Sequence, residues 1–373
     1  MDKQLHIVTH DVPWPVDYGG VVDLFYKIKA LHHLGIKIHL HCFTSNKNEQ
    51  PHLLQYCESV HYYPRKLSFS LSNLLLPYIV QSRINNDLIS NLNKDKHPVL
   101  LEGIHCSYPL YKDLLKDKIV WVRLHNVECN YYRKLFENES SFFKKIYYYT
   151  ESVLLKKYEN KLAKKASYLT VSLSDSDTYH KLFSPKSTFF LPVFSSWSKI
   201  KSTAGLGNYC LYHGNLSVNE NIRAVEWLLN EVFSKCDFPF VIAGKNPSEN
   251  LKNLAHRYNH TCIVENPSEF ELDDLIRKAH INILPSFNNT GVKLKIVHAL
   301  FNGKHCISNV IGVKGSGFEA LCHTAEKAEE YINCIRKLLD LPFTEEDIKS
   351  REALLTLLYN NDENAIKLIN CIY

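Results

Sequence analysis

Two loops in the first half of the chain carry residue types that could hold an anion or move a proton. Gly19 and Gly20 come one loop after the strand-like run Leu5–Thr9, and a glycine pair lets the backbone approach a ligand and offer N–H groups to an anion. A plain tight turn would use the same pair, and the spacing alone favours that alternative. His125 comes directly after the strand-like run Ile119–Leu124, where an imidazole can donate, accept or shuttle a proton near neutral pH. Its position at a strand end distinguishes it from the other histidines, most of which we expect to be ordinary.

Two loops in the second half favour a phosphate-containing ligand. Gly214, Asn215 and Ser217 follow a strand-like run at Tyr209–His213, and the helix expected after them would direct its N-terminus at an anion. Lys245 ends another such run, FVIAGK, and supplies the point charge that suits a diphosphate. The alternative for Lys245 is a solvated lysine in a loop.

The last of these loops opens a helix with two cations. It contains Gly291, and Lys293 and Lys295 fall in the first turn of the helix expected over Lys293–Phe301. Cations at a helix N-terminus oppose the helix macrodipole and lower stability unless an anion binds between them. We therefore expect a bound anion at this helix.

These loops need a scaffold that brings strand ends together. Short apolar, β-branched or aromatic runs alternate with helical patterns along the chain, which is typical of parallel βαβ units. The strands expected in the first half are Leu5–Thr9, Lys37–Phe43, Ser59–Tyr63, Pro98–Gly103, Ile119–Leu124 and Tyr168–Ser172. Those expected in the second half are Tyr209–His213, Phe238–Ala243, Thr261–Val264, Ile281–Leu284 and His305–Ser308. The polar stretch FSSWSKIKSTAGLGN between the two series is the natural linker.

We therefore predict an α/β protein with two Rossmann-like, doubly wound domains that face a cleft. The length of 373 residues agrees, because it exceeds what one hydrophobic core usually organises. The expected domains are residues 1–195 and residues 205–355, followed by a C-terminal helix in residues 356–373 that crosses back to the first domain. In open α/β sheets, ligands bind beyond the carboxyl ends of the strands, so the loops above should line the cleft.

The composition narrows the class of protein. Apolar residues make up 45% and charged residues 22%, as in ordinary soluble globular proteins. The longest apolar stretch, Leu71–Val80, is too short to span a bilayer and contains Pro77. The first residues lack the regions of a signal peptide, so we expect a cytoplasmic protein. The eleven cysteines include no C-x-x-C pair, and we expect reduced thiols that serve as small core residues.

Residues 131–166 concentrate Lys, Arg and aromatic residues in one helical pattern. Such a helix can lie on an anionic membrane surface, which would place the protein peripherally on the inner face of the membrane. The alternative is a long helix that packs on the core and has a solvated lysine face. Nucleic-acid binding is not expected, because no recognised binding module surrounds the segment.

Taken together, these segments resemble the retaining GT-B glycosyltransferases of family 4, the glycosyl transferases group 1 class. The resemblance covers almost the whole chain, and its best parts are YGGVVDLFYKIKALHHLG, LYHGNLSVNENIRAVEWL, FVIAGK and GVKLKIVHALFNGKHCISNVIGVKG. It implies transfer of a hexose-type sugar from a nucleotide-diphosphate sugar to a glycan or lipid-linked acceptor, in surface polysaccharide or glycoconjugate assembly. It also implies that no metal and no further cofactor are needed, because basic residues and helix dipoles stabilise the diphosphate.

The resemblance implies roles for individual residues as well. Residues 1–195 would form the acceptor-side domain, and residues 205–355 would bind the nucleotide sugar. Gly19 and Gly20 would face the donor diphosphate or the acceptor, and His125 would lie near the transferred sugar. Lys245 and Lys295 would neutralise the leaving diphosphate. The other donor-site residues would be Gly214, Asn215, Ser217, Glu265, Gly291, Lys293 and His298, with Glu265 beside the nucleobase.

Some positions depart from the family pattern. Family members commonly carry a Glu, seven residues and a second Glu, which holds the ribose hydroxyls; here Thr290 and His298 take these places. An imidazole can hydrogen-bond a hydroxyl but cannot accept with two oxygens. Asn215 and Asn221 stand where a basic pair is often found. The alternative function is therefore a non-catalytic GT-B-like protein that binds a glycan or a partner enzyme. A sugar-nucleotide epimerase fits less well, because the carboxylates it would need are not evident in the loops.

Overall fold

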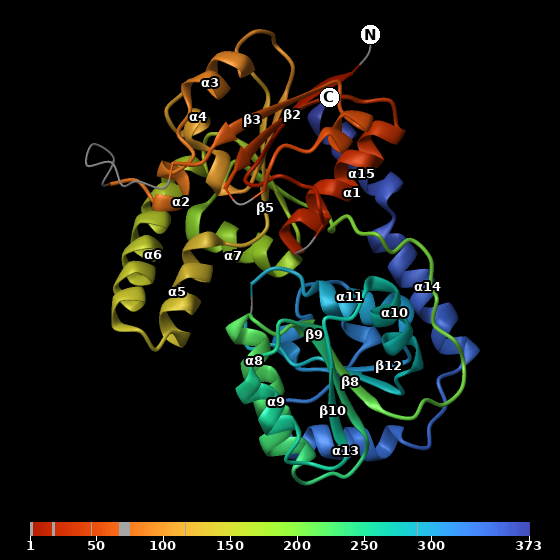
Figure 1. Ribbon diagram of the computed structural model, residues 1–373. Helices are drawn as coiled ribbons and strands as arrows, with labels where there is room; N and C mark the ends of the chain where they lie inside the picture. Colours follow the sequence, from red (N-terminus) through yellow and green to blue (C-terminus); the bar gives the residue numbers. More distant parts are fainter. Residues whose placement is uncertain (1–2, 17–18, 46, 67–74, 116, 289) are drawn as a thin grey trace. The chain divides into compact units, whose positions relative to one another are not determined.

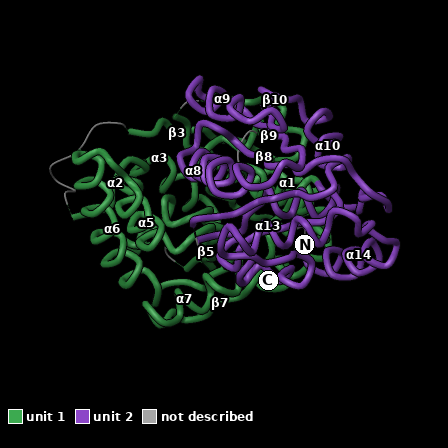
Figure 2. Tube along the Cα trace, turned by 90° about the horizontal axis from the view of Figure 1, so that it is seen from below, with its two compact units in different colours: residues 1–196, 359–373 green, residues 197–358 purple. Residues whose placement is uncertain are grey.

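The computed structural model describes residues 3–16, 19–45, 47–66, 75–115, 117–288 and 290–373 (Figure 1). The chain forms two compact units, which Figure 2 shows in different colours. Unit 1 comprises residues 1–196 and 359–373, and unit 2 comprises residues 197–358. Unit 2 therefore interrupts the chain of unit 1. None of the described helices is long and apolar enough to cross a membrane, and residues 71–74 of the longest apolar stretch lie outside the described residues.

A parallel sheet organises unit 1. Its described strands are β1 (Gln4–Thr9), β2 (Lys37–Thr44), β3 (Ser59–Pro64), β4 (Val99–Glu102), β5 (Val120–Leu124), β6 (Ser167–Thr170) and β7 (Ser187–Phe190). They lie in the order β3-β2-β1-β4-β5-β6-β7, and every pair is parallel. The chain changes direction across the sheet between β1 and β4, and ligands of doubly wound folds bind at that point, beyond the carboxyl ends of the strands.

Helices pack on both faces of this sheet. The described ones are α1 (Gly19–His33), α2 (Tyr78–Gln81), α3 (Asn86–Leu92), α4 (Tyr108–Tyr111), α5 (Glu128–Asn138), α6 (Phe142–Leu162), α7 (Leu173–Phe183) and α15 (Asn361–Ile372), with short 3-10 turns at Pro51–Gln55 and Ile104–Cys106. Because side chains alternate along a strand, Val99 and Leu101 join the core under α6, whereas Leu100 joins the core under α1 and α15. The last segment of the chain thus packs against α1.

The one helix expected over residues 131–166 is wrong, because the structure has two helices there. The backbone of Glu139 is extended, and its carboxylate accepts hydrogen bonds from the N–H groups of Ser140 and Ser141, both at 3.0 Å. Ser141 is extended too and precedes the first turn of α6. The N–H groups of Ser140 and Ser141 are thus bonded to a side chain and not to helical carbonyls. For this reason α5 ends before these residues and α6 begins after them. As a result α5 and α6 lie side by side as a helical hairpin (Figure 1).

A second parallel sheet organises unit 2. Its described strands are β8 (Cys210–Asn215), β9 (Phe240–Lys245), β10 (Thr261–Glu265), β11 (Ile281–Ile283), β12 (His305–Ser308) and β13 (His323–Thr324), in the order β10-β9-β8-β11-β12-β13. The helices are α8 (Asn219–Trp227), α9 (Glu249–Ala255), α10 (Glu269–Lys278), α11 (Leu294–Asn302), α12 (Val310–Val313), α13 (Ala328–Leu338) and α14 (Glu345–Tyr359), whose last residue belongs to unit 1. A π-helical segment, Leu228–Phe233, continues α8, and a 3-10 turn lies at Glu319–Leu321.

Both units are parallel-sheet α/β structures, which confirms the predicted fold class. The strand order of unit 2, and that of the first six strands of unit 1, is the one typical of dinucleotide-binding doubly wound sheets. The sequence pattern did not predict the strands β7 and β13, nor the helices α2, α3, α4, α7, α12 and α13. Each sheet therefore presents a row of loops at the carboxyl ends of its strands, and the predicted site residues lie in or next to these loops.

Candidate functional site

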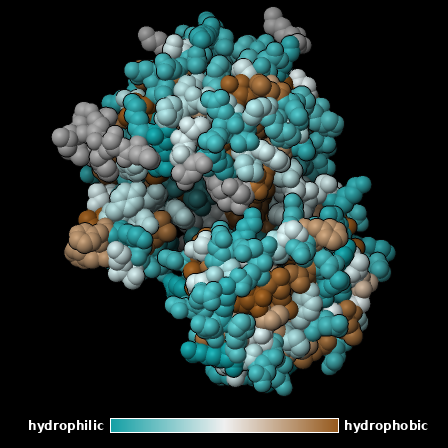
Figure 3. Space-filling model, in the orientation of Figure 1, coloured by the Kyte–Doolittle hydropathy of each residue, from teal (hydrophilic) through white to brown (hydrophobic). Residues whose placement is uncertain are grey.

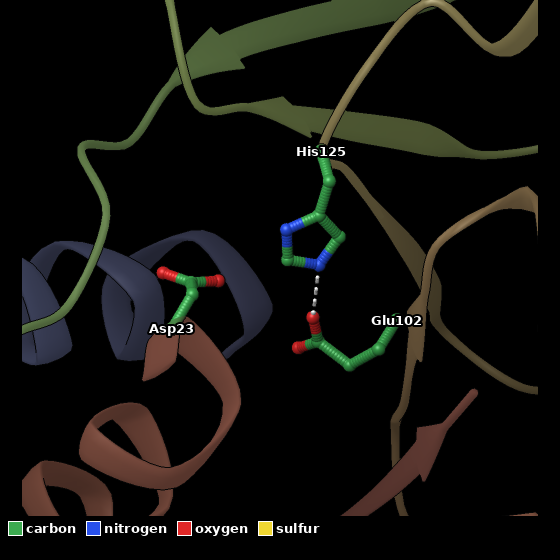
Figure 4. A group of neighbouring side chains, drawn as sticks. All are labelled: Asp23, Glu102 and His125. Carbon is green, nitrogen blue, oxygen red and sulfur yellow. Dashed lines mark hydrogen bonds and ion pairs between the residues drawn. The ribbon is translucent and has the colours of Figure 1, made fainter. Parts of the chain in front are cut away.

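In unit 1, His125 lies at the carboxyl end of β5 and contacts a buried acid at the end of β4. The two strands are neighbours, with Glu102 opposite Arg123. The Nε2 atom of His125 is 3.2 Å from Oε2 of Glu102, as Figure 4 shows. Burial alone would raise the pKa of the Glu102 carboxyl, but the ammonium of Lys27 and the imidazole of His125 lower it. The histidine predicted from the sequence is thus paired with a carboxylate that the sequence analysis missed.

A group of buried charges holds Glu102 in place. Lys27 lies one turn after Asp23 on α1, and its Nζ atom is 2.8 Å from Oδ2 of Asp23 and 2.7 Å from Oε1 of Glu102. The guanidinium of Arg123 contacts both oxygens of Asp23, at 3.2 and 3.1 Å. Burial would raise the pKa of Asp23, but Arg123 and Lys27 hold it far below its usual range. The two carboxylates, Asp23 and Glu102, and the two cations, Lys27 and Arg123, therefore have no net charge together. They lie buried in unit 1 next to His125.

Within the described part of the chain, Asp23, Glu102 and His125 offer possible metal-ligand atoms within 4.8 Å of one another. The ammonium of Lys27 already lies against both carboxylates, at 2.8 and 2.7 Å. A divalent cation bound there would face this enclosed positive charge at short range. The donor set therefore does not fit a resident metal ion.

Two more histidines surround His125 and were not predicted. His10 directly follows β1, and its ring centre is 5.2 Å from that of His105 and 5.9 Å from that of His125. Burial lowers the pKa of His10 to about 3 and holds that of His105 well below its usual value. The Nδ1 atoms of His10 and His105 are buried and have no hydrogen-bond partner among the described residues. Arg83 fixes the backbone here by donating to the carbonyl of His10 at 3.2 and 3.0 Å. The cluster therefore has unused hydrogen-bonding capacity beside the dyad of His125 and Glu102.

The predicted glycine pair begins a helix of the same site. Gly19 and Gly20 are the first residues of α1, four and three residues before Asp23. The preceding residues Asp17 and Tyr18 of the predicted loop lie outside the described residues. An open helix start without a side chain on either glycine remains compatible with the predicted anion contact.

In unit 2, the ends of β8 and β9 approach each other unusually closely. Gly214 lies opposite Gly244, and Asn215 lies opposite Lys245. A Cβ on Gly244 would be 1.9 Å from the carbonyl oxygen of Gly214, so only glycine fits there. The amide oxygen of Asn215 accepts from the N–H and the hydroxyl of Ser217, at 3.0 and 2.8 Å. The side chain of Lys245 is exposed beside this turn.

The second predicted lysine, Lys295, is connected to the same strand end. Its Nζ atom donates to the hydroxyl of Tyr212 at 2.9 Å and to Oδ1 of Asn221 at 3.0 Å. The other amide atom of Asn221, Nδ2, donates to the carbonyl of Asn215 at 2.9 Å. Burial lowers the pKa of Lys295 to about 8. The structure thus connects Lys295 through one amide side chain to Asn215, which lies next to Lys245 in the sheet.

His298 stands where the resemblance expects a glutamate, and it has a carboxylate partner. Its Nε2 atom is 2.6 Å from Oδ1 of Asp273 on α10. Its ring stacks on Trp197 with centres 4.5 Å apart and meets the ring of His213 edge-on at 5.5 Å. The hydrogen bond from His298 is the main cause of the lowered pKa of Asp273, whose other oxygen is 3.6 Å from Lys201. The carboxylate of Asp273 therefore places a negative charge next to His298. The resemblance implies that this charge would belong to residue 298 itself.

The remaining predicted residues lie at the borders of this site. Gly291 has a φ of 64°, in the left-handed region that favours glycine. Lys293 precedes the first turn of α11 and donates to the carbonyl of Thr290 at 2.7 Å. Glu265 lies opposite Gly244 at the end of β10, and its carboxylate is 2.8 Å from Lys252. Asn289 of the same loop lies outside the described residues.

Several solved glycosyltransferases of the GT-B class share this fold. An α,α-trehalose-phosphate synthase (UDP-forming) from Burkholderia xenovorans superposes with a TM-score of 0.64 at 8% identity, over 99% of both chains. AviGT4, a glycosyltransferase of avilamycin A biosynthesis, gives 0.57 at 10% identity, over 99% of this chain and 97% of the other. A mutant of TarM from S. aureus, in complex with UDP among other ligands, gives 0.62 at 9% identity, over 99% of both chains. The chain therefore has the GT-B fold.

The sequence comparison identifies a family for the chain. No family model matches it. It is 31% identical over 334 residues, 83% of this chain and 84% of the other, to the "Uncharacterized 44.6 kDa protein in cps region" of Klebsiella pneumoniae. The chain belongs to the family of this Klebsiella pneumoniae protein.

Proposed function

We propose that the protein is a retaining, family 4-like glycosyltransferase that moves a hexose-type sugar from a nucleotide-diphosphate sugar to a glycan or lipid-linked acceptor. The arrangement at the ends of β8 and β9 is the observation that supports this most directly. The exposed Lys245 lies beside Asn215, and Lys295 reaches Asn215 through Asn221. Two lysines near one glycine-lined strand end, with α8 beginning four residues after Asn215, form a suitable site for a diphosphate.

Unit 1 would contribute the acceptor side and a polar contact to the transferred sugar. The bond between Nε2 of His125 and Glu102 selects the tautomer in which Nδ1 can accept a hydrogen bond from a sugar hydroxyl. Glu102 in turn is fixed by its ion pair with Lys27. Catalysis would rest on the positioning of two substrates and on electrostatic stabilisation of the departing diphosphate, without a metal ion.

The comparisons support the same kind of substrate. The trehalose-phosphate synthase is named as UDP-forming, and the TarM mutant was solved with UDP. The relative from a cps region supports polysaccharide assembly as the process. We place the reaction in the cytoplasm, on the inner face of the membrane if the acceptor is lipid-linked.

A donor screen tests the proposal. The purified protein should release nucleoside diphosphate from one of the common sugar nucleotides when glycan or lipid-linked acceptors are added. Lys245→Met and Lys295→Met should each lower kcat/KM about 100-fold, as the loss of an electrostatic stabiliser does. The control Lys278→Met changes an exposed lysine of unit 2 that pairs with Asp274, and it should leave kcat/KM unchanged. A folded protein that turns over no donor would contradict the proposal.

A non-catalytic GT-B-like protein that binds a glycan or a partner enzyme is the second candidate. It is favoured by the internal partners of two donor-site residues, Asp273 for His298 and the pair of Tyr212 and Asn221 for Lys295. Calorimetric titration with UDP, GDP and ADP separates the candidates. Micromolar binding of one of them supports the transferase, and absence of binding supports the second candidate.

The titration also has a pH signature. Burial lowers the pKa of Lys295 to about 8, and a bound diphosphate would raise it again. Affinity should therefore fall as the pH rises above 8, by up to about tenfold per pH unit. Lys295→Gln should bind more weakly and without this dependence. An affinity for the wild-type protein that stays constant up to pH 9 would show that Lys295 does not face the diphosphate.

A further inference from the structure

We propose that the outer side of α6 binds an anionic lipid bilayer. The surface, called the hairpin face below, consists of Phe142, Phe143, Ile146, Tyr149 and Val153. It lies on the α5–α6 hairpin of unit 1. The proposal does not depend on the transferase activity proposed above, because the surface contains none of the site residues named there.

Contacts along one side of α6 fix which side of the helix faces outward. The carboxylate of Glu151 accepts from the N–H groups of Tyr78 and Ile79, both at 2.9 Å. About two helical turns further on, the carboxylate of Glu159 accepts from the N–H groups at the start of α5, at 3.2 and 2.9 Å. Leu155 and Leu162 are fully buried on the same side. The helix therefore cannot rotate to bury its opposite side.

The opposite side of α6 is apolar and exposed. Phe142 and Phe143 are 70% and 83% exposed, and Ile146, Tyr149 and Val153 are 50%, 47% and 38% exposed. Residues 142, 146, 149 and 153 are spaced by four, three and four, so they form one stripe along the helix. The stripe is roughly 16 Å long at 1.5 Å per residue. Figure 3 shows apolar side chains at the far end of the hairpin among hydrophilic ones. A stripe of this kind is typical of an interaction surface.

The acidic residues of the hairpin do not offset its positive charge on this side. Residues 131–166 include nine Lys or Arg and four Glu, a net charge of +5 that equals the formal net charge of the whole chain. Glu151 and Glu159 are buried against the rest of unit 1. Glu137 is 2.7 Å from Lys134 and so offsets that one lysine, and Glu139 accepts hydrogen bonds from the N–H groups of Ser140 and Ser141. The excess of charge that faces solvent is therefore positive.

Basic side chains border the hairpin face directly. Lys144 and Lys145 follow the two phenylalanines in the first turn of α6, and Lys144 is exposed. The guanidinium of Arg133 is 5.6 Å from the ring centre of Tyr149. Long basic side chains beside an apolar stripe can reach anionic headgroups while the stripe enters the acyl boundary.

The basic residues also indicate whether a second copy of the chain or a lipid bilayer covers this surface. A second copy of the chain would bring two basic borders together, which is unfavourable. A bilayer with anionic lipids offers both an apolar layer and a negative surface, and each juxtamembrane Lys or Arg gains from that surface potential. The combination of exposed aromatic residues and a basic border therefore fits an anionic bilayer better than another copy.

Vesicle flotation with the full chain tests the proposal. The protein should float with vesicles of phosphatidylglycerol and phosphatidylethanolamine, should remain unbound with phosphatidylcholine alone, and should bind less as salt increases. The double variant Phe142→Ser, Phe143→Ser should lower the partition coefficient at least about tenfold. Phe270→Ser is the matched control, because Phe270 is 81% exposed on unit 2 and has no such surroundings. The double variant Lys144→Gln, Lys145→Gln should lower binding to the anionic vesicles about fivefold per lysine.

Thermal melts of all variants check that the fold is intact, since the changed side chains are exposed and should leave Tm unchanged. Phe143→Trp should retain binding and show blue-shifted fluorescence with the anionic vesicles, because Trp suits the membrane interface. Absence of vesicle binding at low salt, or an equal loss with Phe270→Ser, would overturn the proposal. A dimer in sedimentation that Phe143→Ser abolishes, without vesicle binding, would assign the surface to a second copy instead.

Discussion

Lys27 and Arg123 are fully buried, and each faces a carboxylate. Removing charges from water is costly, and a buried group of ions is stable only when each charge keeps its partners. Here Asp23 and Glu102 provide them, and Phe194 donates its N–H to Asp23 at 2.8 Å as well. His125 is held by Glu102, and Glu102 belongs to a buried group in which every charge faces a charge of opposite sign. The position of His125 therefore depends on the whole group.

Replacement of one member should be strongly destabilising. Lys27→Met keeps the length of the side chain but leaves Glu102 facing no ammonium group and Asp23 with Arg123 alone. We expect the free energy of unfolding to fall by about 3–5 kcal/mol, measured as the shift in urea unfolding. Lys29→Met, at an exposed position on the same helix, should change it by less than about 1 kcal/mol. Equal losses for the two variants would show that the buried group does not stabilise unit 1.

At this scale, the sequence predicted only part of the candidate site. His125, Lys245 and Lys295 could be named because each follows or begins an element whose end belongs to a ligand-binding edge. Glu102 looked like the last residue of an apolar strand, and nothing in VLLEG shows that an ammonium group from α1 reaches it. The partners of buried charges come from distant parts of the chain, so the pattern within one segment cannot reveal them.

The α5–α6 hairpin depends on acids that cap other elements. Glu151, in the middle of α6, accepts the first two N–H groups of α2, which have no intrahelical partner. Burial raises the pKa of Glu151, and the two N–H groups partly offset that increase. The side chain of Glu151 thus fixes the orientation of α6 and also caps the first turn of α2.

Loss of this cap should destabilise unit 1 measurably. In Glu151→Ala the N–H groups of Tyr78 and Ile79 lose their partner inside the protein, which we expect to cost about 2 kcal/mol. Glu137→Ala removes an exposed acid of the same hairpin and should change the free energy of unfolding by less than about 0.5 kcal/mol. Denaturant unfolding of both variants measures the difference, and a Glu151→Ala protein as stable as the wild type would disprove the capping role.

At the scale of elements, apolar periodicity predicted most strands to within two or three residues. It succeeded because a parallel strand covered on both faces is a short apolar run between polar loops, as in the run VLL of β4. It failed for β7 and β13, which are short strands at one edge of each sheet and carry partly exposed residues. It also joined α5 and α6, because the break at Glu139 arises from a local side-chain contact that periodicity does not detect.

The whole molecule contains many histidines that remain neutral when folded. Burial lowers the pKa of nine described histidines, namely His6, His10, His39, His41, His61, His105, His213, His305 and His323. Below pH 6.5 the unfolded chain binds protons at these positions and the folded protein does not, so stability falls with pH. Three buried glutamates act in the opposite direction, because their pKa values are raised, to about 8 for Glu128 and to about 7 for Glu159, with Glu151 raised as well.

Stability should therefore be greatest near neutral pH. Between pH 5 and 6.5 the nine histidines outnumber the three glutamates, so the free energy of unfolding should fall by about 4 kcal/mol or more from pH 7 to pH 5. From pH 7 to about 8, Glu128 still loses its proton on unfolding, so its contribution to stability should decrease over that interval. Urea midpoints at pH 5, 7 and 9 measure this curve. A midpoint at pH 5 equal to or above that at pH 7 would contradict it.

The order of residues in the two units has a consequence for synthesis. A ribosome releases all strands of the first sheet before it makes unit 2, yet Leu368 and Ile372 of α15 reach their places against that sheet's core only at the end of translation. Until then the nascent first unit has an uncovered apolar face beside α1, while the second unit already has all of its strands. We therefore expect the interrupted unit to be the one that needs protection by chaperones during synthesis, and the inserted unit to mature first.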